Sequence, residues 1–230
     1  MSINRRQFLR NTAVVGGSLI IGIELAGCGE KSLAPATAGD SFQPNSFLEI
    51  TPRGEIILQL NRAEMGQGVY TSLTTLVAEE LEVDPASITV VQAPSHPDFA
   101  DPDMHMQLTG GSSSLKNSFM PLRQAGANAK AILLAAAAKD WSVAQNTLIA
   151  ENGVVRDPVS KREARYADLV ATAKTLPAPK DAPLKAPEQF KLIGKFDRRL
   201  DAQQKVDGSS IFGIDIQRDR ALRDLLEGRA

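Results

Sequence analysis

The sequence predicts an α/β (α+β) fold in which helices pack on a mixed sheet. Two β-rich runs, residues 47–50 and 55–60, flank a short turn that contains proline and glycine, as in a β-hairpin. Helical periodicity follows in residues 69–82, and the β-branched run 88–91 then predicts a buried strand. Strands that alternate with an amphipathic helix in this way indicate a helix packed on a sheet.

One face of the helix predicted over residues 69–82 is apolar. The apolar residues at helical spacing are Leu73, Leu76, Val77 and Leu81. Glu79, Glu80 and Glu82 lie largely elsewhere on the helix, which makes the segment amphipathic. Asp84 and Pro85 are expected to end it, because the residue before a proline disfavours helical geometry.

A second, longer helix is predicted from about residue 113 to residue 139. Its many alanines give it a high helix propensity and allow close packing. Pro121 falls inside it and should bend or interrupt it near Phe119, because proline removes one hydrogen bond of the helix.

The last predicted elements are short. Asn152 and Gly153 form a hairpin turn between residues 147–150 and 154–156, and residues 166–175 form a helix. Residues 176–190 are rich in proline and lysine, which predicts an extended linker rather than a packed element.

Composition argues against a nucleic-acid-binding protein. The chain has 230 residues, a net charge of −1 and no basic stripe, and its aromatic residues are sparse. Cys28 is the only cysteine, which excludes an intrachain disulfide and a cysteine-rich metal site.

The histidines do not predict a metal site. His96 and His105 are the only two, and they are too far apart for a helical pair. Asp98, Asp101 and Asp103 lie near them without the glycine and glutamate positions of a calcium loop. We therefore expect no protein-built metal centre, and a solvated loop over residues 92–108.

The N-terminal residues predict export. Asn4–Arg10 is typical of a twin-arginine signal, and the apolar stretch 12–26 is too short for a usual membrane span. Residues 25–28 fit a lipobox with Cys28 as the lipidated residue, although an ordinary signal cleavage point fits as well. The expected location is the periplasm, with a lipid anchor if Cys28 is modified, and residues 29–43 read as a flexible tether.

Two glycine-bearing loops precede the two main helices. Residues 64–68 (Glu-Met-Gly-Gln-Gly) lead into the first helix, and residues 109–114 (Thr-Gly-Gly-Ser-Ser-Ser) lead into the second. Unpaired N–H groups and the positive end of the helix dipole favour an anion such as phosphate at such positions. The alternative interpretation is a pair of N-capped helices without a ligand.

Together these loops resemble the molybdopterin-binding domain of the xanthine dehydrogenase family. Residues 64–71 match the family's E-M-G-Q-G-x-x-T loop, and residues 109–114, with Asn117 and residues 125–127, match its second cofactor loop and helix. The early position of the motifs resembles the large subunit of isoquinoline 1-oxidoreductase and related periplasmic aldehyde oxidoreductases. The resemblance extends from about residue 47 to residue 217.

The resemblance implies a molybdenum cofactor, molybdopterin cytosine dinucleotide, held in a site that is incomplete in this chain. A neutral amide at Gln67 suits a group beside the pterin or an oxo ligand, although a solvent-facing turn glutamine is the alternative. The cofactor-binding residues expected from the two loops are Gly66, Gln67, Gly68, Thr109, Gly110, Gly111, Ser112 and Ser113. A [2Fe-2S] small subunit is the implied partner, and a cytochrome c is a candidate electron acceptor.

The family's glutamate general base and a further glycine-rich loop are missing from the sequence, so no catalytic residue is assigned. The expected division is a signal peptide (1–27), a tether (28–45), a partial molybdopterin-binding domain (46–176), a linker (177–197) and the truncated start of a next domain (198–230). The chain is thus expected to be an inactive N-terminal part of a hydroxylase that oxidises aldehydes or N-heterocycles. The alternative is an exported lipoprotein that binds a ligand or partner without catalysis.

Overall fold

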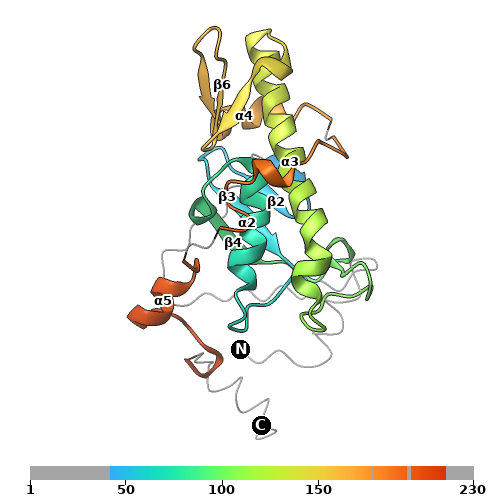
Figure 1. Cartoon of the computed structure of the whole chain (residues 1–230), viewed down its shortest axis with the longest axis vertical. Coiled ribbons are helices and arrows are strands. Elements are labelled where there is room, and N and C mark those ends of the chain that lie inside the picture. Colours follow the sequence, from blue (N-terminus) through green and yellow to red (C-terminus); the bar gives the residue numbers. More distant parts are fainter. Residues whose placement is uncertain (1–41, 178, 196–197, 216–230) are drawn as a thin grey trace, which may run out of the picture. The chain divides into compact units, whose positions relative to one another are not determined.

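The computed structural model describes residues 42–177, 179–195 and 198–215 (Figure 1). The strands are β1 (Phe42–Asn45), β2 (Leu48–Ile50), β3 (Ile56–Leu60), β4 (Ile88–Gln92), β5 (Ile149–Glu151), β6 (Val154–Arg156) and β7 (Glu163–Arg165). The α-helices are α2 (Val69–Leu81), α3 (Ser113–Trp141), α4 (Tyr166–Ala173) and α5 (Ala202–Asp207). The predicted hairpins, the strand at 88–91 and the three helices are all present, which confirms an α/β fold.

The first sheet is mixed, with the strand order β1-β2-β3-β4. β1, β2 and β3 run antiparallel, whereas β3 and β4 run parallel, from the pair Ile56 and Ile88 to the pair Leu60 and Gln92. A parallel pair needs a crossover connection, and α2 provides it. The carboxyl ends of β3 and β4 therefore lie at the same edge of the sheet, and each of these ends leads into one of the two glycine-bearing loops.

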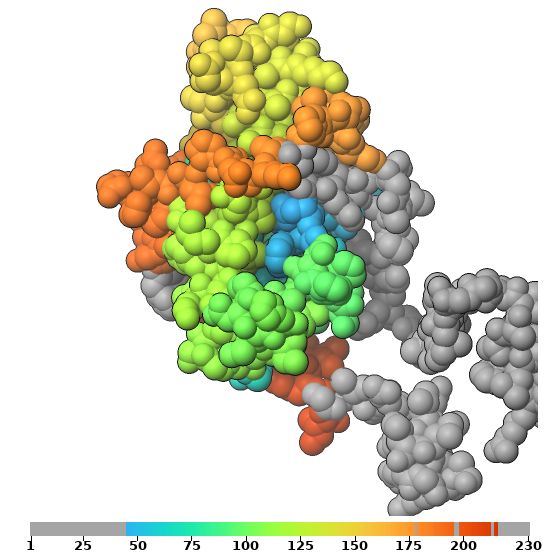
Figure 2. Space-filling view, turned by 90° about the vertical axis from the view of Figure 1, so that its right-hand side faces the viewer, coloured from blue at the N-terminus to red at the C-terminus, as the bar shows by residue number. Residues whose placement is uncertain are grey.

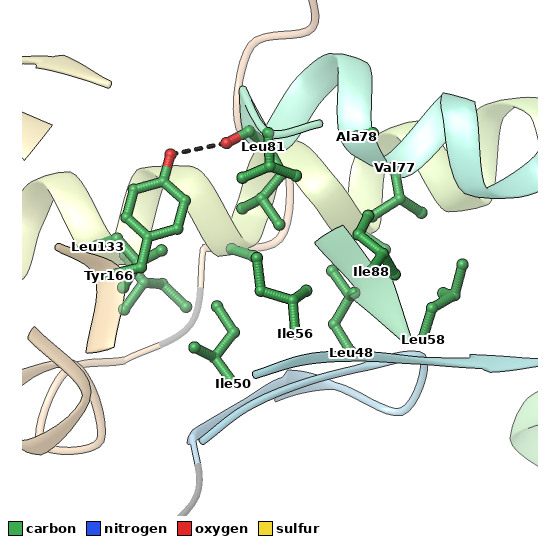
Figure 3. Close-up of a cluster of buried hydrophobic side chains, with 14 of the residues drawn as sticks. Leu48, Ile50, Ile56, Leu58, Val77, Ala78, Leu81, Ile88, Leu133 and Tyr166 are labelled. Carbon is green, nitrogen blue, oxygen red and sulfur yellow. Dashed lines mark hydrogen bonds between the residues drawn. The ribbon is translucent and has the colours of Figure 1, made fainter. Parts of the chain in front are cut away.

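The core lies between this sheet and the pair α2 and α3 (Figure 3). Leu48, Ile50 and Leu58 of the sheet are buried against Val77 of α2 and Leu133 of α3. α3 continues past this core to the second, antiparallel sheet, β5-β6-β7, and to α4 (Figure 1). There the buried Tyr166 hydroxyl donates a 2.7 Å hydrogen bond to the Leu81 carbonyl at the end of α2, shown as the dashed line in Figure 3. Burial raises the pKa of Tyr166, so this hydroxyl keeps its proton.

Gly126 allows α3 to approach the backbone of α2. A Cβ atom at this position would lie 2.7 Å from the Val77 carbonyl oxygen, closer than non-bonded atoms approach. We expect Gly126→Ala to lower the free energy of unfolding by about 1–3 kcal/mol, because one of the helices must shift. Urea denaturation measures this change. Gly110→Ala is the matched control, since its nearest neighbour would be a leucine methyl group at 3.7 Å; an equal loss in both variants would contradict the packing argument.

Three details differ from the expectations. Residues 42–45, placed in the tether, form β1, because they pair with β2 at the edge of the sheet. α3 runs through Pro121 without interruption, since its buried residues on both sides of the proline, Ser118 and Leu122, hold it in place. β7, which the sequence did not predict, completes the second sheet.

Part of the expected linker is attached to α2 by buried carboxylates. Glu79, expected on the polar side of the helix, is 1% exposed and accepts hydrogen bonds from three consecutive backbone N–H groups, those of residues 191–193. It also pairs with the Lys185 ammonium at 2.6 Å. Burial opposes ionisation, but Lys185 and the three N–H groups outweigh it and lower the pKa of Glu79 to about 2. Residues 185–193 are thus part of the packed structure, and the prediction of an unpacked linker there is wrong.

Candidate cofactor-binding site

The two glycine-bearing loops lie against each other at the carboxyl edge of β3 and β4. The backbone N–H of Ala63, just before the first loop, donates a 2.7 Å hydrogen bond to the Thr109 hydroxyl at the start of the second. Forty-six residues separate the two partners in the sequence. The sequence predicted both loops as one site, and the parallel strand pair brings them together.

A buried arginine next to the first loop supports the second loop. Arg62, two residues after β3, is 1% exposed and donates hydrogen bonds to the Leu108 carbonyl and to the Ser113 hydroxyl. Its guanidinium also pairs with Asp101. Arg62 therefore fixes the second loop relative to the strand that carries the first, and it is a supporting residue of the candidate site that the sequence interpretation missed.

Asp101 is buried, so its expected place in a solvated loop is wrong. Its carboxylate pairs with Arg62 and accepts hydrogen bonds from the Asn117 amide and from the N–H groups of Asp103 and Met104. Arg62 is the main reason that the pKa of Asp101 lies below its usual value, and the other donors add to the effect against the opposing influence of burial. Ala93 and Phe99 of segment 92–112 are buried as well, whereas its other residues are exposed or half-buried and lie next to the first turns of α3 (Figure 2, green to yellow-green).

The N–H groups of the first loop already bind a carboxylate that belongs to the loop itself. The Glu64 carboxylate accepts hydrogen bonds from the N–H groups of Gly66, Gly68 and Tyr70, at 2.8–3.0 Å. These groups lie at the start of α2, where a carboxylate is favoured by the helix dipole. The loop is therefore held in shape by Glu64, and these N–H groups are engaged within the chain rather than unpaired as expected.

Gln67 lies exposed at the tip of the first loop. Its amide oxygen accepts from the Met65 N–H, and its amide nitrogen donates to the Ala63 carbonyl at 2.9 Å. One amide N–H remains, since a glutamine has two. The side chain is thus held in place and still has a donor to offer on the exposed surface.

The second loop has the free donors that an anion requires. Among the described residues, no partner accepts from the N–H groups of Gly110, Gly111 and Ser112. Ser113 instead donates both its N–H and its hydroxyl to the Gly110 carbonyl, at 3.1 and 3.0 Å. A Cβ atom added at Gly111 would meet no atom within 4 Å, so the space beside it is open. Unpaired N–H groups at the start of the 29-residue α3 fit a phosphate group of a cofactor.

The predicted cofactor residues line an open surface. A small hollow lined by residues such as Asn61, Arg62 and Pro121 includes none of them. Since ligand sites usually enclose most of their ligand, a site built on these loops alone would be open on one side.

The described part of the chain contains no cluster of three or more histidine, cysteine, aspartate or glutamate side chains that could hold a metal ion. A ring nitrogen of His96 instead accepts a hydrogen bond from the backbone N–H of Asp98. The backbone N–H of His105 donates to the Asp101 carbonyl. Within the same ranges, no helix has the length and apolar character needed to cross a membrane. Cys28 and the paired arginines at 5 and 6 lie outside the described residues.

A mixed sheet, a crossover helix and two loops that meet beyond a parallel strand pair place the chain in the α/β class. Comparison with known families gives the particular one: residues 3–216 match the molybdopterin cofactor-binding domain. The chain belongs to this family, which confirms the resemblance stated from the two motifs.

Three curated relatives show how much of a longer protein this chain spans. It is 30% identical to the beta subunit of isoquinoline 1-oxidoreductase from Brevundimonas diminuta over 94% of this chain and 32% of the relative. It is 28% identical to a membrane-bound aldehyde dehydrogenase (pyrroloquinoline-quinone) of Gluconacetobacter polyoxogenes, over 93% of this chain and 28% of the relative. A nicotinate dehydrogenase subunit from Pseudomonas putida is 29% identical over 80% of this chain and 15% of its own length. The chain thus spans about a third of these relatives or less.

Solved structures are also similar. The Cu,Mo-CO dehydrogenase matches 59% of this chain and 17% of its own, with a TM-score of 0.45 and 20% identity. Quinoline 2-oxidoreductase from Pseudomonas putida 86 matches 60% of this chain and 17% of its own, with a TM-score of 0.41 and 20% identity. The alternative of a noncatalytic lipoprotein is not supported by the three curated relatives, which are named as oxidoreductase or dehydrogenase proteins.

Proposed function

We propose that this chain forms one wall of the molybdenum-cofactor site in the large subunit of an oxidoreductase that acts on aldehydes or N-heterocycles. The observation that carries this proposal is the hydrogen bond between Ala63 and Thr109, which joins the two motif loops into one surface. The names of the relatives point the same way, since they describe oxidation of isoquinoline, aldehydes and nicotinate.

The second loop would bind the phosphate end of the cofactor. The N–H groups of Gly110, Gly111 and Ser112 would donate to its oxygens, with Thr109 and Ser113 holding the loop in shape. The amide of Gln67 would donate to the pterin or to an oxo group, with Gly66 and Gly68 shaping its loop. When bound, the cofactor would supply the redox chemistry by which oxygen from water enters a C–H bond of the substrate. The subgroup resemblance favours the cytosine dinucleotide form.

The complete site would require residues beyond those of this chain. No glutamate here matches the family's general base, and the chain spans 32% of the Brevundimonas relative. Near its end, Ile211, Phe212 and Ile214 are exposed, as expected if these side chains pack against further protein. A [2Fe-2S] small subunit would accept electrons from the complete enzyme, and a cytochrome c is a candidate for the next acceptor.

A pair of substitutions at Gly111 tests the function. In a complete large subunit that contains this chain, we expect Gly111→Asp to remove most of the bound molybdenum, because a carboxylate beside the free N–H groups repels phosphate. Gly111→Asn is the matched control: asparagine also tolerates the positive φ of 59° at this position, it has a similar shape and it carries no charge. Elemental analysis of the purified proteins measures the difference. Equal molybdenum contents in the two variants would remove the second loop from the proposed site.

The export proposal is tested separately. Replacing Arg5 and Arg6 with lysine should keep the chain in the cytoplasm, and Cys28→Ala should abolish a lipid label without loss of the fold. Cell fractionation and mass spectrometry of the mature N-terminus measure these outcomes. Unchanged export, or a mature chain that begins after residue 28, would contradict the respective part of the proposal.

A further inference from the structure

Arg199 reaches back to the first loop from a distant part of the sequence. Its guanidinium donates to the Gly66 carbonyl at 2.7 Å and to the Glu64 carboxylate at 3.1 Å. The next residue adds a contact, since the Leu200 N–H donates to the Thr71 hydroxyl at 3.0 Å. The segment that begins at residue 198 is therefore attached both to the loop and to the first turn of α2.

The arginine is itself held in orientation. Asp201 accepts two hydrogen bonds from it, each of 2.8 Å, through two different nitrogens. Lys205 pairs with the same aspartate at 2.6 Å. A planar guanidinium fixed on one side by a carboxylate presents its remaining donors in a set direction, which a lysine ammonium cannot do.

The two groups that Arg199 contacts determine the shape of the loop. Glu64, whose side chain is 10% exposed, gathers the N–H groups of Gly66, Gly68 and Tyr70. Gly66 immediately precedes Gln67. The orientation of the Gly66 carbonyl group therefore fixes the orientation of the peptide group that joins the two residues. Arg199 thus acts on the carboxylate that organises the loop and on the backbone beside its exposed amide.

We propose that Arg199, oriented by Asp201, is a positioning residue that holds the loop of residues 64–68 in the form that presents Gln67. Its role toward the cofactor rests on the proposed function, whereas its hold on the loop does not. Through this contact, the segment following residue 198 determines the geometry of a loop that lies more than a hundred residues earlier.

Amide hydrogen exchange on the chain, without cofactor, tests the hold on the loop. In Arg199→Ala we expect the amides of Gly66, Gly68 and Tyr70 to exchange about tenfold faster or more, with little change in the thermal midpoint. Arg199→Lys should restore only part of the protection, because an ammonium cannot make the forked contacts. Asp201→Asn, which keeps the arginine, should have an intermediate effect and serves as the second variant if Arg199→Ala does not fold.

The titration of Glu64 gives a readout that a purely structural role would not change. Burial opposes its ionisation, but the three N–H groups and the positive charge of Arg199 outweigh this effect and hold the pKa of Glu64 below its usual value. The charged groups that face it are Arg199 and, beyond this arginine, Asp201. The amide NMR signals of Gly66 and Gly68 should therefore titrate at a higher pH in Arg199→Ala than in the wild type.

Unchanged exchange and an unchanged titration midpoint in both Arg199→Ala and Asp201→Asn would overturn the proposal. A loosened loop with full molybdenum content in the full-length protein would overturn the role of Arg199 toward the cofactor and leave its hold on the loop, since the loop would then not need this arginine to serve the cofactor. A failure of the Gly111 test leaves the exchange results intact, so the two proposals can fail independently.

Discussion

The isolated chain, purified from a host that makes the molybdenum cofactor, is expected to contain little or no molybdenum and to leave aldehydes unoxidised. A cofactor held between domains receives hydrogen bonds from each of them, and this chain offers the free donors of Gly110, Gly111 and Ser112 on an open surface. Charge-assisted hydrogen bonds contribute about 1.5–3 kcal/mol each, so the loss of several weakens binding by many orders of magnitude.

Elemental analysis and dye reduction with an aldehyde or an N-heterocycle measure this outcome. The relative from Brevundimonas diminuta, of which this chain matches 32%, is the control when it is produced in the same host. Molybdenum in a one-to-one ratio with the isolated chain, together with dye reduction, would show that it is not a fragment. Reading the DNA that follows its gene for the missing glycine-rich and glutamate motifs tests the same point independently.

Arg123→Met is expected to lower the free energy of unfolding by about 3–5 kcal/mol, because it leaves a buried carboxylate without its charged partner. Arg123 of α3 pairs with Glu80 of α2 at 2.7 Å, and the Glu80 side chain is 0% exposed. The same guanidinium donates to the Lys185 carbonyl at 2.6 Å and lies over the ring of Phe190. Methionine keeps much of the apolar contact and removes the charge, so the loss reports mainly on the ion pair.

Urea denaturation of the two single variants and one double variant measures the effect. Arg165→Met is the matched control, since Arg165 pairs with Asp168 on the surface, and it should change stability little. The double variant with Glu80→Leu should recover part of the loss, because no unpaired charge is then buried. If Arg123→Met and Arg165→Met change stability equally, the Glu80 pair does not hold the two helices together.

The helices, most of the strands and the two motif loops could be predicted because their signals are local. The apolar spacing in residues 69–81 and the β-branched run at 88–91 each lie within one element. Their parallel pairing then follows from the crossover helix and explains why the loops meet. The role of Pro121 could not be predicted in the same way, since the packing of residues far away in the sequence decides whether a helix continues through it.

The charged residues that support the site could not be predicted for a similar reason. The sequence gives no signal for Arg62 and places Asp101 in a solvated loop, yet the two side chains are buried together. Glu79 and Glu80 occupy positions that an amphipathic pattern assigns to solvent, and they are buried because residues 185–193 cover them. Such pairs depend on contacts between segments that are far apart in the sequence, for which the spacing of residues along one element gives no signal.

The hydrogen bonds that Glu79 accepts from three successive backbone N–H groups affect where the domain can be truncated. A shortened chain ending at residue 176, where the composition changes, would remove the N–H groups of Lys191, Leu192 and Ile193 and the ammonium of Lys185. Glu79 would then lose every donor that the structure shows for it, although Ala182 is the one buried apolar residue deleted among those described, whereas Glu80 would keep the Arg123 guanidinium. We therefore expect a stable shortened domain to extend at least to Ile193, where Glu79 finds its last hydrogen-bond donor, and not to end where the hydrophobic sequence pattern ends.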